Sequence, residues 1–255
     1  MEFQARDLIT KRQEKILEIV QQQGFATIET LARDFRISAQ SVRRDIIKLD
    51  AEGLLQRFHG GVGVREAPVR MDYVEKRNTA TEAKRRIGIK AASMIPDGSV
   101  VFLDVGTTVE AVAQALRDRT DLRVFTCSIS SAAILAGRPG IDLFVLGGSV
   151  RGIDGSIVGE TTLAALGRFR FDYAVIGFSG IDADGTLMDY DLEKIAVKEA
   201  AISQANAALV VGDSTKFRKT AVVRFVISAK SLHLVTEEAP SRDLVDALPD
   251  VILAK

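Results

Sequence analysis

Three polar segments with the chemistry of a phosphate site each follow an apolar stretch in the second half of the chain. They are Asp104-Val105-Gly106-Thr107-Thr108, Gly147-Gly148-Ser149-Val150-Arg151 and Asp213-Ser214-Thr215-Lys216-Phe217. Glycine lets backbone N–H groups approach an anion, hydroxyls and a helix N-terminus donate to it, and Arg or Lys neutralises it. Each segment alone also fits an ordinary capped turn. Their shared place after apolar stretches favours one anion site at a sheet edge.

A fourth polar segment, 177–186, leads into Glu193 and Lys198. Asp182 and Glu193 could accept hydrogen bonds from the hydroxyls of a sugar or polyol, and Lys198 could point back toward the loop. Dense Asp and Gly are equally typical of turns, and Asp184-Gly185 is a turn signal. The spacing of the acidic residues excludes a calcium loop.

A basic amphipathic helix is predicted from the N-cap Ser38 to about Ala51, with Gly53 ending it. Its inward face carries Val42, Ile46 and Leu49, and its outward face carries Gln40, Ser41, Arg44 and Lys48, with Arg43 on the flank. Gln and Arg can make bidentate contacts to adenine and guanine edges, and Ser, Arg and Lys can hold phosphates. Charge alone does not separate such a face from an ordinary solvated helix.

The neighbouring segments favour DNA binding. Residues 11–23 have a helical pattern, and Thr27 opens a shorter helix that a tight turn at Arg36-Ile37 joins to Ser38. This is the helix-turn-helix order that places a second helix in the major groove. Strands at 54–58 and 62–64, joined by a turn at 59–61, predict a wing that brings Arg57 and His59 near the DNA backbone.

Composition indicates a soluble protein of two domains. The chain has 255 residues, 47% hydrophobic and 27% charged. No segment approaches the ~20 apolar residues that span a bilayer, so we expect a cytoplasmic protein with no membrane partner. With one cysteine, Cys127, and two histidines, His59 and His233, we expect no disulfide framework, no metal site and no cofactor.

Charge is balanced overall and slightly positive around the basic helix. The net charge is zero, but residues 33–65 carry seven basic and four acidic side chains, or +3. A monomer with so modest a positive surface would bind DNA weakly, so we expect a homodimer or homotetramer with paired half-sites. Asp45 is expected to pair with a neighbouring arginine, because phosphate repels a carboxylate.

The second half of the chain alternates strands and helices. Apolar strands are predicted at 100–103, 122–126, 143–146, 173–176, 208–211 and 232–235, and helices at 109–116, 130–136 and 192–204. Uniformly apolar strands favour a mostly parallel sheet covered on both faces, hence a Rossmann-like α/β fold. The predicted organisation is a winged helix-turn-helix domain (1–64), a linker and the start of a connecting helix (65–86), and an α/β domain (87–255).

The motifs resemble the DeoR family of bacterial transcriptional regulators. In the first domain they are Ser38, 41–46 (SVRRDI), Leu49, Gly53 and 57–61 (RFHGG), although Ser41 stands where the family usually has Thr. In the second they are Lys84, Ile87, Gly106-Thr107-Thr108, Gly147-Gly148, Gly159-Glu160, Phe171-Asp172, Gly180-Ile181-Asp182, Lys198, Asp213, Ser214, Lys216 and Phe217. The resemblance implies a fold shared with sugar-phosphate isomerases, a double-stranded DNA operator, and release by a phosphorylated carbohydrate or polyol such as glycerol 3-phosphate.

Three functions account for parts of the sequence. A ligand-responsive, non-enzymatic repressor explains both halves. A sugar-phosphate isomerase, with Asp182 or Glu193 as general base, explains the second half and leaves the first sixty residues without a role. An architectural DNA-binding protein with an oligomerising α/β domain would not need phosphate-type loops. The repressor is therefore the preferred interpretation.

Overall fold

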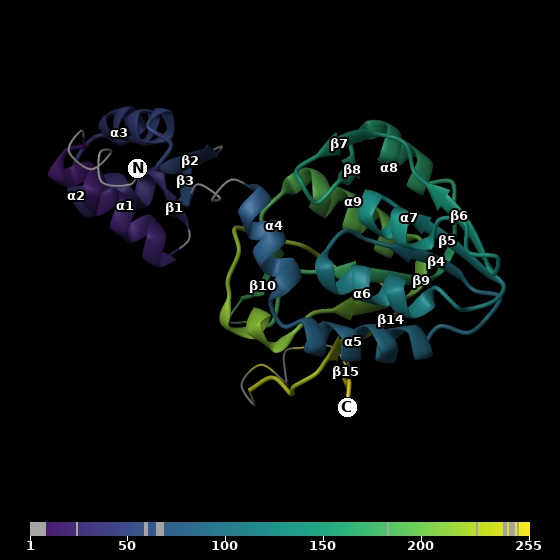
Figure 1. The fold of residues 1–255 in the computed structure, drawn as a ribbon. Helices are drawn as coiled ribbons and strands as arrows, with labels where there is room; N and C mark the ends of the chain where they lie inside the picture. Colours follow the sequence, from purple (N-terminus) through teal and green to yellow (C-terminus); the bar gives the residue numbers. More distant parts are fainter. Residues whose placement is uncertain are drawn as a thin grey trace. The chain divides into compact units, whose positions relative to one another are not determined.

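The computed structural model describes residues 9–23, 25–58, 61–64, 69–182, 184–227, 229–241, 244, 248 and 250–255. The chain divides into two compact units, Met1–Asp72 and Tyr73–Lys255 (Figure 1). Of the residues singled out above, His59 lies outside the described residues.

The first unit contains the three predicted helices, α1 (Lys11–Gln23), α2 (Ile28–Phe35) and α3 (Ala39–Ala51). The side chain of Thr27 accepts a hydrogen bond from the Thr30 N–H and caps α2, and that of Ser38 accepts from the Ser41 N–H and caps α3. Between the two helices, Arg36 adopts a left-handed conformation with φ of 53°. The helix-turn-helix order read from the sequence is confirmed.

A three-stranded antiparallel sheet completes the first unit. The predicted wing consists of β2 (Leu55–Phe58) and β3 (Gly61–Val64), and β1 (Phe25–Thr27) pairs with the other edge of β3. The sequence did not predict β1, because three residues between two helices are too few to show a strand pattern. The apolar faces of the helices meet in one core, which includes Ile16, Val20, Leu31, Val42, Ile46, Leu49, Leu55 and Val62.

The second unit is built on seven parallel strands in the order β15-β14-β12-β9-β4-β5-β6. In that order the strands are Asp250–Leu253, Ser231–Thr236, Ala205–Val211, Phe171–Gly177, Val100–Leu103, Leu122–Thr126 and Ile141–Val145. Smaller strands are β7 (Ser149–Arg151), β8 (Ser156–Val158), β10 (Gly180–Ile181), β11 (Leu187–Asp189) and β13 (Val223–Arg224). The predicted parallel α/β fold is confirmed.

The helices of the second unit are α4 (Val69–Asn78, beginning before the division), α5 (Thr81–Ser93), α6 (Thr107–Leu116), α7 (Ile129–Leu135), α8 (Glu160–Leu166) and α9 (Leu192–Ser203). A short 3-10 helix, η2, spans Ser214–Arg218. Most of the segment predicted as a linker, 65–86, is thus helical, because it holds α4 and the start of α5. We refer to α4 as the connecting helix.

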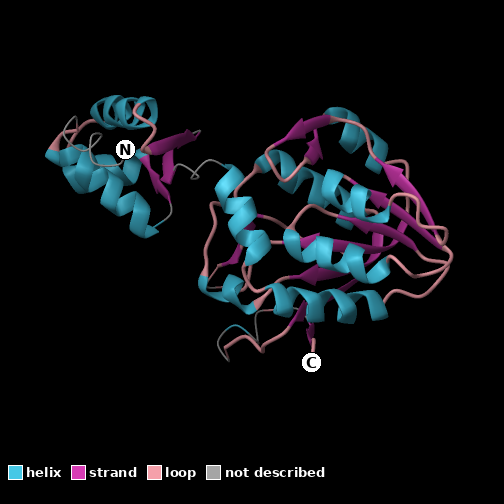
Figure 2. Ribbon diagram, in the orientation of Figure 1, coloured by secondary structure: helices cyan, strands magenta, loops and turns pink. Residues whose placement is uncertain are grey.

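Helices cover both faces of the large sheet (Figure 2). Alternate residues of each strand point to opposite faces: Phe102 packs with α8 and α9, whereas Val101 and Leu103 pack with α5, α6 and α7. Burial on both sides explains why the central strands β4, β9 and β12 are mostly apolar, as the sequence indicated. The edge strand β6 is mostly apolar too, although its Phe144 and Val145 are exposed.

The order of the strands reverses at β4. From β4 the chain proceeds outward through β5 to β6, then returns to place β9 on the other side of β4 and continues to β12, β14 and β15. Adjacent loops diverge at such a switch point, so the crevice beyond the carboxyl ends of β4 and β9 is the expected place for a ligand.

Candidate functional site

The outward face of α3 is a continuous polar surface. Gln40, Arg43, Arg44 and Lys48 are all exposed, and Gln40, Arg44 and Lys48 are four residues apart along the helix. Ser38 is exposed as well, but its hydroxyl is engaged as the N-cap and lies 3.0 Å from the Ser41 hydroxyl. On the wing, Arg57 is exposed, and its backbone N–H donates to Asp50 at 3.3 Å. Within this unit, the surface has the donors needed for phosphates and base edges.

Asp45 is turned away from that surface. Its carboxylate is buried and accepts from Arg12 Nε at 2.7 Å and from Gln13 Nε2 at 3.0 Å, both on α1. The predicted arginine partner therefore exists, but it is Arg12, 33 residues away in sequence, rather than an arginine beside Asp45. These bonds tie α3 to α1.

A buried charge cluster occupies the switch point of the large sheet. Lys198 Nζ, on α9, donates to Asp104 Oδ2 at 2.5 Å and to the Gly177 carbonyl at 2.8 Å, and lies 3.3 Å from Asp189 Oδ2. Burial opposes the charged form of Lys198, but the two carboxylates outweigh it and hold its pKa above the ordinary lysine value. Asp104, which directly follows β4, and Lys198, on α9, are thus paired, and their charges offset each other.

The loop after β4 turns directly into α6. Gly106 is the N-cap with φ of 137°, a conformation that side chains rarely adopt, and an added Cβ there would meet no atom within 4 Å. Glycine is therefore needed for its backbone and not for space. Thr108 is buried and Thr107 is half-buried in the first turn of the helix. The loop presents a helix N-terminus, the feature that suits phosphate.

Lysines converge near the end of β12 around one aspartate. Lys84 and Lys216 are buried, and the buried Asp213 caps η2. Lys84 Nζ donates to the carbonyls of Lys76 and of Thr79, the latter at 2.7 Å. Burial, followed by repulsion from Lys76 and other lysines, lowers the pKa of Lys216 to about 8.

Many of the charges that act on Lys216 also act on Lys84. Burial lowers its pKa first, Asp213 and Glu110 oppose that shift, and Lys219 and Lys76 add to it. We call Lys76, Lys84, Lys216 and Lys219 the lysine cluster. Four cations near Asp213 leave an excess of positive charge beside the carboxyl ends of the central strands.

The remaining predicted site residues form separate pairs. Arg151 on β7 lies 3.5 Å from Glu193 at the start of α9, and Asp182 is paired with Arg224 on β13. Gly147 and Gly148 follow β6 at the edge of the sheet, where a Cβ on Gly148 would lie 2.1 Å from Thr162 Oγ1. Close packing therefore accounts for Gly148 without a ligand.

Comparison with known proteins identifies both units. Residues 12–67 match the DeoR-like helix-turn-helix domain, and residues 79–238 match the DeoR C terminal sensor domain. The chain belongs to the DeoR family of transcriptional regulators. The sensor domain includes Asp104, Thr107, Thr108, Lys84 and Lys216.

Similar DeoR-family proteins are named as repressors. The Glycerol-3-phosphate regulon repressor of Escherichia coli (strain K12) is 36% identical over 94% of this chain and 96% of its own. The Lactose phosphotransferase system repressor of Lactococcus lactis subsp. lactis is 33% identical over 81% of this chain and 82% of its own. Among solved structures, ribose 5-phosphate isomerase A of Methanocaldococcus jannaschii matches with a TM-score of 0.42 and 16% identity over 55% of each chain, too little to bear on function.

Sequence reasoning gave no role to several residues of this DeoR sensor domain. Lys84 was noted only through the family resemblance, and Lys76, Lys219, Tyr73 and Glu110 were not singled out. None of them belongs to a motif with a recognised role: Tyr73, Lys76, Lys84 and Glu110 lie on helices, and Lys219 follows η2. A basic residue at a predicted buried helix position, as at Lys84, was the available signal.

Membrane-spanning and metal-binding features are both missing from the described part of the chain. No helix there is both long and apolar enough to cross a membrane. No group of three or more His, Cys, Asp and Glu side chains there is arranged to hold a metal ion.

Proposed function

We propose that this DeoR-family regulator represses genes of carbohydrate or polyol metabolism and leaves its operator when a phosphorylated effector binds the sensor domain. Glycerol 3-phosphate is the first candidate, because it appears in the name of a relative that is 36% identical over 94% of this chain. The outward face of α3 would read double-stranded DNA in the major groove.

The lysine cluster is the observation that carries the effector proposal. Lys84 and Lys216 are buried, and Lys76 and Lys219 repel the charge of each. Asp213 opposes this repulsion at both lysines, and Glu110 opposes it at Lys84. A phosphate dianion would relieve that repulsion and accept several charge-assisted hydrogen bonds. A neutral sugar would not, so the cluster favours a phosphorylated ligand.

The sheet order restricts which predicted residues one small effector can contact. The loops after β4, β9 and β12 follow adjacent strands, so Thr107, Thr108 and Lys216 belong to neighbouring loops at one edge of the sheet. The loop of Gly147 and Gly148 follows β6, four strands from β12, or roughly 19 Å at ~4.8 Å per strand. We propose that the phosphate binds near the lysine cluster and the first turn of α6, with Asp104 and Lys198 as the floor.

The connecting helix gives effector binding a route to the DNA-binding unit. Lys76 lies on α4, and its carbonyl accepts from Lys84, so a ligand at the lysine cluster would act on the end of α4. If that ligand favours an arrangement in which paired recognition helices no longer match their half-sites, DNA affinity falls. A coupling of about 1–3 kcal/mol would make a useful switch.

We propose a homodimer or homotetramer. The positive charge around the recognition helix is only +3, from seven basic and four acidic residues between 33 and 65. Two half-sites bound together would supply the affinity that one such surface lacks.

The isomerase and architectural alternatives are both testable. Asp182 and Glu193, the candidate general bases, are each engaged by an arginine. We therefore expect no turnover of ribose 5-phosphate in a coupled assay, and clear turnover would overturn the non-enzyme proposal. A purely architectural protein would bind operator DNA equally with and without phosphorylated metabolites.

A thermal-shift screen of phosphorylated and unphosphorylated C3 to C6 metabolites tests the effector class directly. A true effector at 100 times its dissociation constant should stabilise the protein by about 2.7 kcal/mol. We expect that stabilisation to fall to about 1.4 kcal/mol or less in Lys216→Gln at the same effector concentration. It should persist in Lys230→Gln, since Lys230 is exposed and outside the cluster. If none of the phosphate esters stabilises the protein, the proposal is contradicted.

A further inference from the structure

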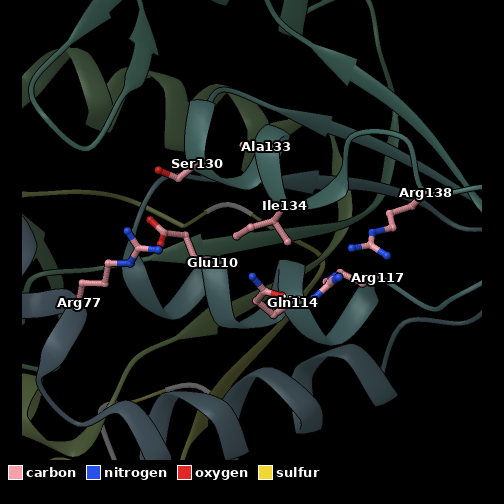
Figure 3. A pocket seen from close by; sticks show the side chains of 8 residues that line it. All are labelled: Arg77, Glu110, Gln114, Arg117, Ser130, Ala133, Ile134 and Arg138. Carbon is pink, nitrogen blue, oxygen red and sulfur yellow. Dashed lines mark hydrogen bonds between the residues drawn. The ribbon is translucent and has the colours of Figure 1, made fainter.

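A second, separate concavity lies on the sensor domain between α6 and α7. It is an open pocket of about 440 Å³, bordered also by Arg77 near the end of the connecting helix (Figure 3). The members of the lysine cluster do not line it, and neither do Thr107 and Thr108. Glu110 is the one residue that borders this pocket and also acts electrostatically on Lys84.

The pocket has an excess of positive charge. Arg77, Arg117 and Arg138 line it, against the single carboxylate of Glu110. None of these arginines forms an ion pair with a carboxylate in the part of the chain that the structure describes. Three arginines against one carboxylate leave a net positive charge on the pocket lining, which favours an anion.

Part of the Arg117 guanidinium is already engaged within the protein. Its Nη1 donates to Gln114 Oε1 at 3.1 Å, and its Nε is buried and has no hydrogen-bond partner among the described residues. Because that Nε is closed off from solvent, an anion in the open pocket would bind Arg117 through its terminal nitrogens. Arg138 lies at the same end of the pocket as Arg117 (Figure 3), so two guanidinium groups are available to one anion.

The opposite end of the pocket carries hydrogen-bond acceptors. Glu110 and Ser130 lie there with Arg77 (Figure 3). Glu110 Oε1 already accepts from Tyr73, but a carboxylate has further acceptor positions and Ser130 offers a hydroxyl. A ligand with an anionic group at one end and hydroxyls at the other would match both ends.

We infer that the pocket between α6 and α7 is a second anion site, which takes the phosphate group of a small hydroxylated metabolite. It is distinct from the proposed effector site, and its existence does not depend on that proposal. Arg117 and Arg138 hold the phosphate, Gln114 orients Arg117, and Glu110 with Ser130 accepts from the hydroxyls. Because Arg77 belongs to the connecting helix, a bound ligand also contacts the segment that leads to the DNA-binding unit.

Calorimetric titration of the full chain with inorganic phosphate, at constant ionic strength set with chloride, tests the inference. Wild type is expected to bind two phosphates per chain. The double variant Arg117→Gln/Arg138→Gln should bind one of them at least tenfold more weakly, since removal of each charge-assisted hydrogen bond to the anion costs about that factor. Arg168→Gln, an exposed arginine outside the pocket, is the matched control and should bind as wild type does.

Two further variants separate this inference from the proposed function and from misfolding. Lys216→Gln should weaken only the other phosphate, so loss of one site in each variant supports two sites. Ile134→Glu places a carboxylate at the pocket wall and should block the same phosphate as the double variant does. Unchanged binding in both pocket variants, or a single phosphate in wild type that Lys216→Gln removes, would overturn the inference. A change in sedimentation mass in the double variant would overturn it too, by assigning the arginines to an interface between copies.

Discussion

The phenol oxygen of Tyr73 donates to Glu110 Oε1 at 2.6 Å and lies 3.0 Å from Ser130 Oγ, joining the connecting helix α4 to α6 and α7. Burial, together with the Glu110 hydrogen bond, raises the pKa of Tyr73, so the phenol stays protonated and can donate. Glu110 is in the first turn of α6, which begins at the loop of Gly106, Thr107 and Thr108. The helix that leads to the DNA-binding unit is thus fixed to the helix that starts at the candidate effector loop.

Tyr73→Phe should weaken the response to effector more than it weakens effector binding. The variant removes one hydrogen bond to a buried carboxylate and should cost about 1 kcal/mol or more in stability. Fluorescence anisotropy with labelled operator, with and without effector, would measure the response, and Tyr173→Phe on β9 is the control. Equal effector-induced release in Tyr73→Phe and wild type would show that this link does not transmit the signal.

Effector affinity should fall as pH rises through about 8. The pKa of Lys216 is lowered to about 8 by burial and by the lysines around it, so below that pH the side chain is charged and attracts phosphate. Above it the charge is lost, whereas a phosphate ester, with a second pKa of about 6, stays a dianion. Calorimetry from pH 6.5 to 9 on wild type and Lys216→Gln is the measurement. A flat profile in wild type, or the same slope in both, would exclude Lys216 as the titrating group.

The lowered pKa of Lys216 also predicts a change in stability with pH. In the folded chain the lysine loses its proton at about 8, below the ordinary value of 10.5, so the folded state disfavours the charged form. Without effector, stability from this group should rise as pH increases from 8 toward 10.5. Denaturant titrations of wild type and Lys216→Gln across that range would reveal the difference.

Arg44→Ala should weaken operator binding and reduce its salt dependence. Arg44 is exposed on the outward face of α3, and removing one phosphate-binding side chain is expected to lower the slope of log K against log salt by about 1. A loss of sequence preference as well would assign Arg44 to a base edge. Lys15→Ala on α1, also exposed, is the control. Unchanged affinity and salt slope would remove Arg44 from the recognition surface.

Asp45→Asn should destabilise the DNA-binding unit by about 1–2 kcal/mol. Asp45 accepts from Arg12 on one oxygen and from Gln13 on the other, and asparagine has only one acceptor oxygen, so one of the two bonds is lost. Because the Arg12 side chain is exposed, solvent weakens its ion pair with Asp45, and we expect a loss of stability nearer to about 1 kcal/mol. Thermal melting would measure it, with Glu14→Gln on the exposed side of α1 as control. A melting temperature equal to that of wild type would mean that the pair adds nothing to stability.

Local rules predicted most of the fold. Ser38 and Thr27 are the caps that their residue types suggested, and the apolar runs became the strands of the large sheet. The elements that were missed depend on pairing with distant parts of the chain. The strand β15 is a short run at the edge of the large sheet, paired with β14, and β1 is a three-residue run paired with β3.

The candidate site was predictable in its loops and not in its charges. Glycine and threonine after β4 follow a local rule for anion binding. Which cation faces which carboxylate depends on strand order, so the pairing of Lys198 with Asp104, 94 residues apart, could not be read from spacing. The same holds for the approach of Lys84 to Asp213, because α5 and η2 meet only in the folded chain.

The most direct test of the central claim is release of an operator, selected in vitro from random DNA, by glycerol 3-phosphate. We predict that the phosphate ester lowers the DNA affinity of wild type by about 5- to 150-fold, the range of ordinary allosteric coupling, and that glycerol has no effect. Lys216→Gln should need at least tenfold more effector for the same release, and Lys230→Gln should respond as wild type does. Release by glycerol, or equal sensitivity of Lys216→Gln and wild type to glycerol 3-phosphate, would contradict the account.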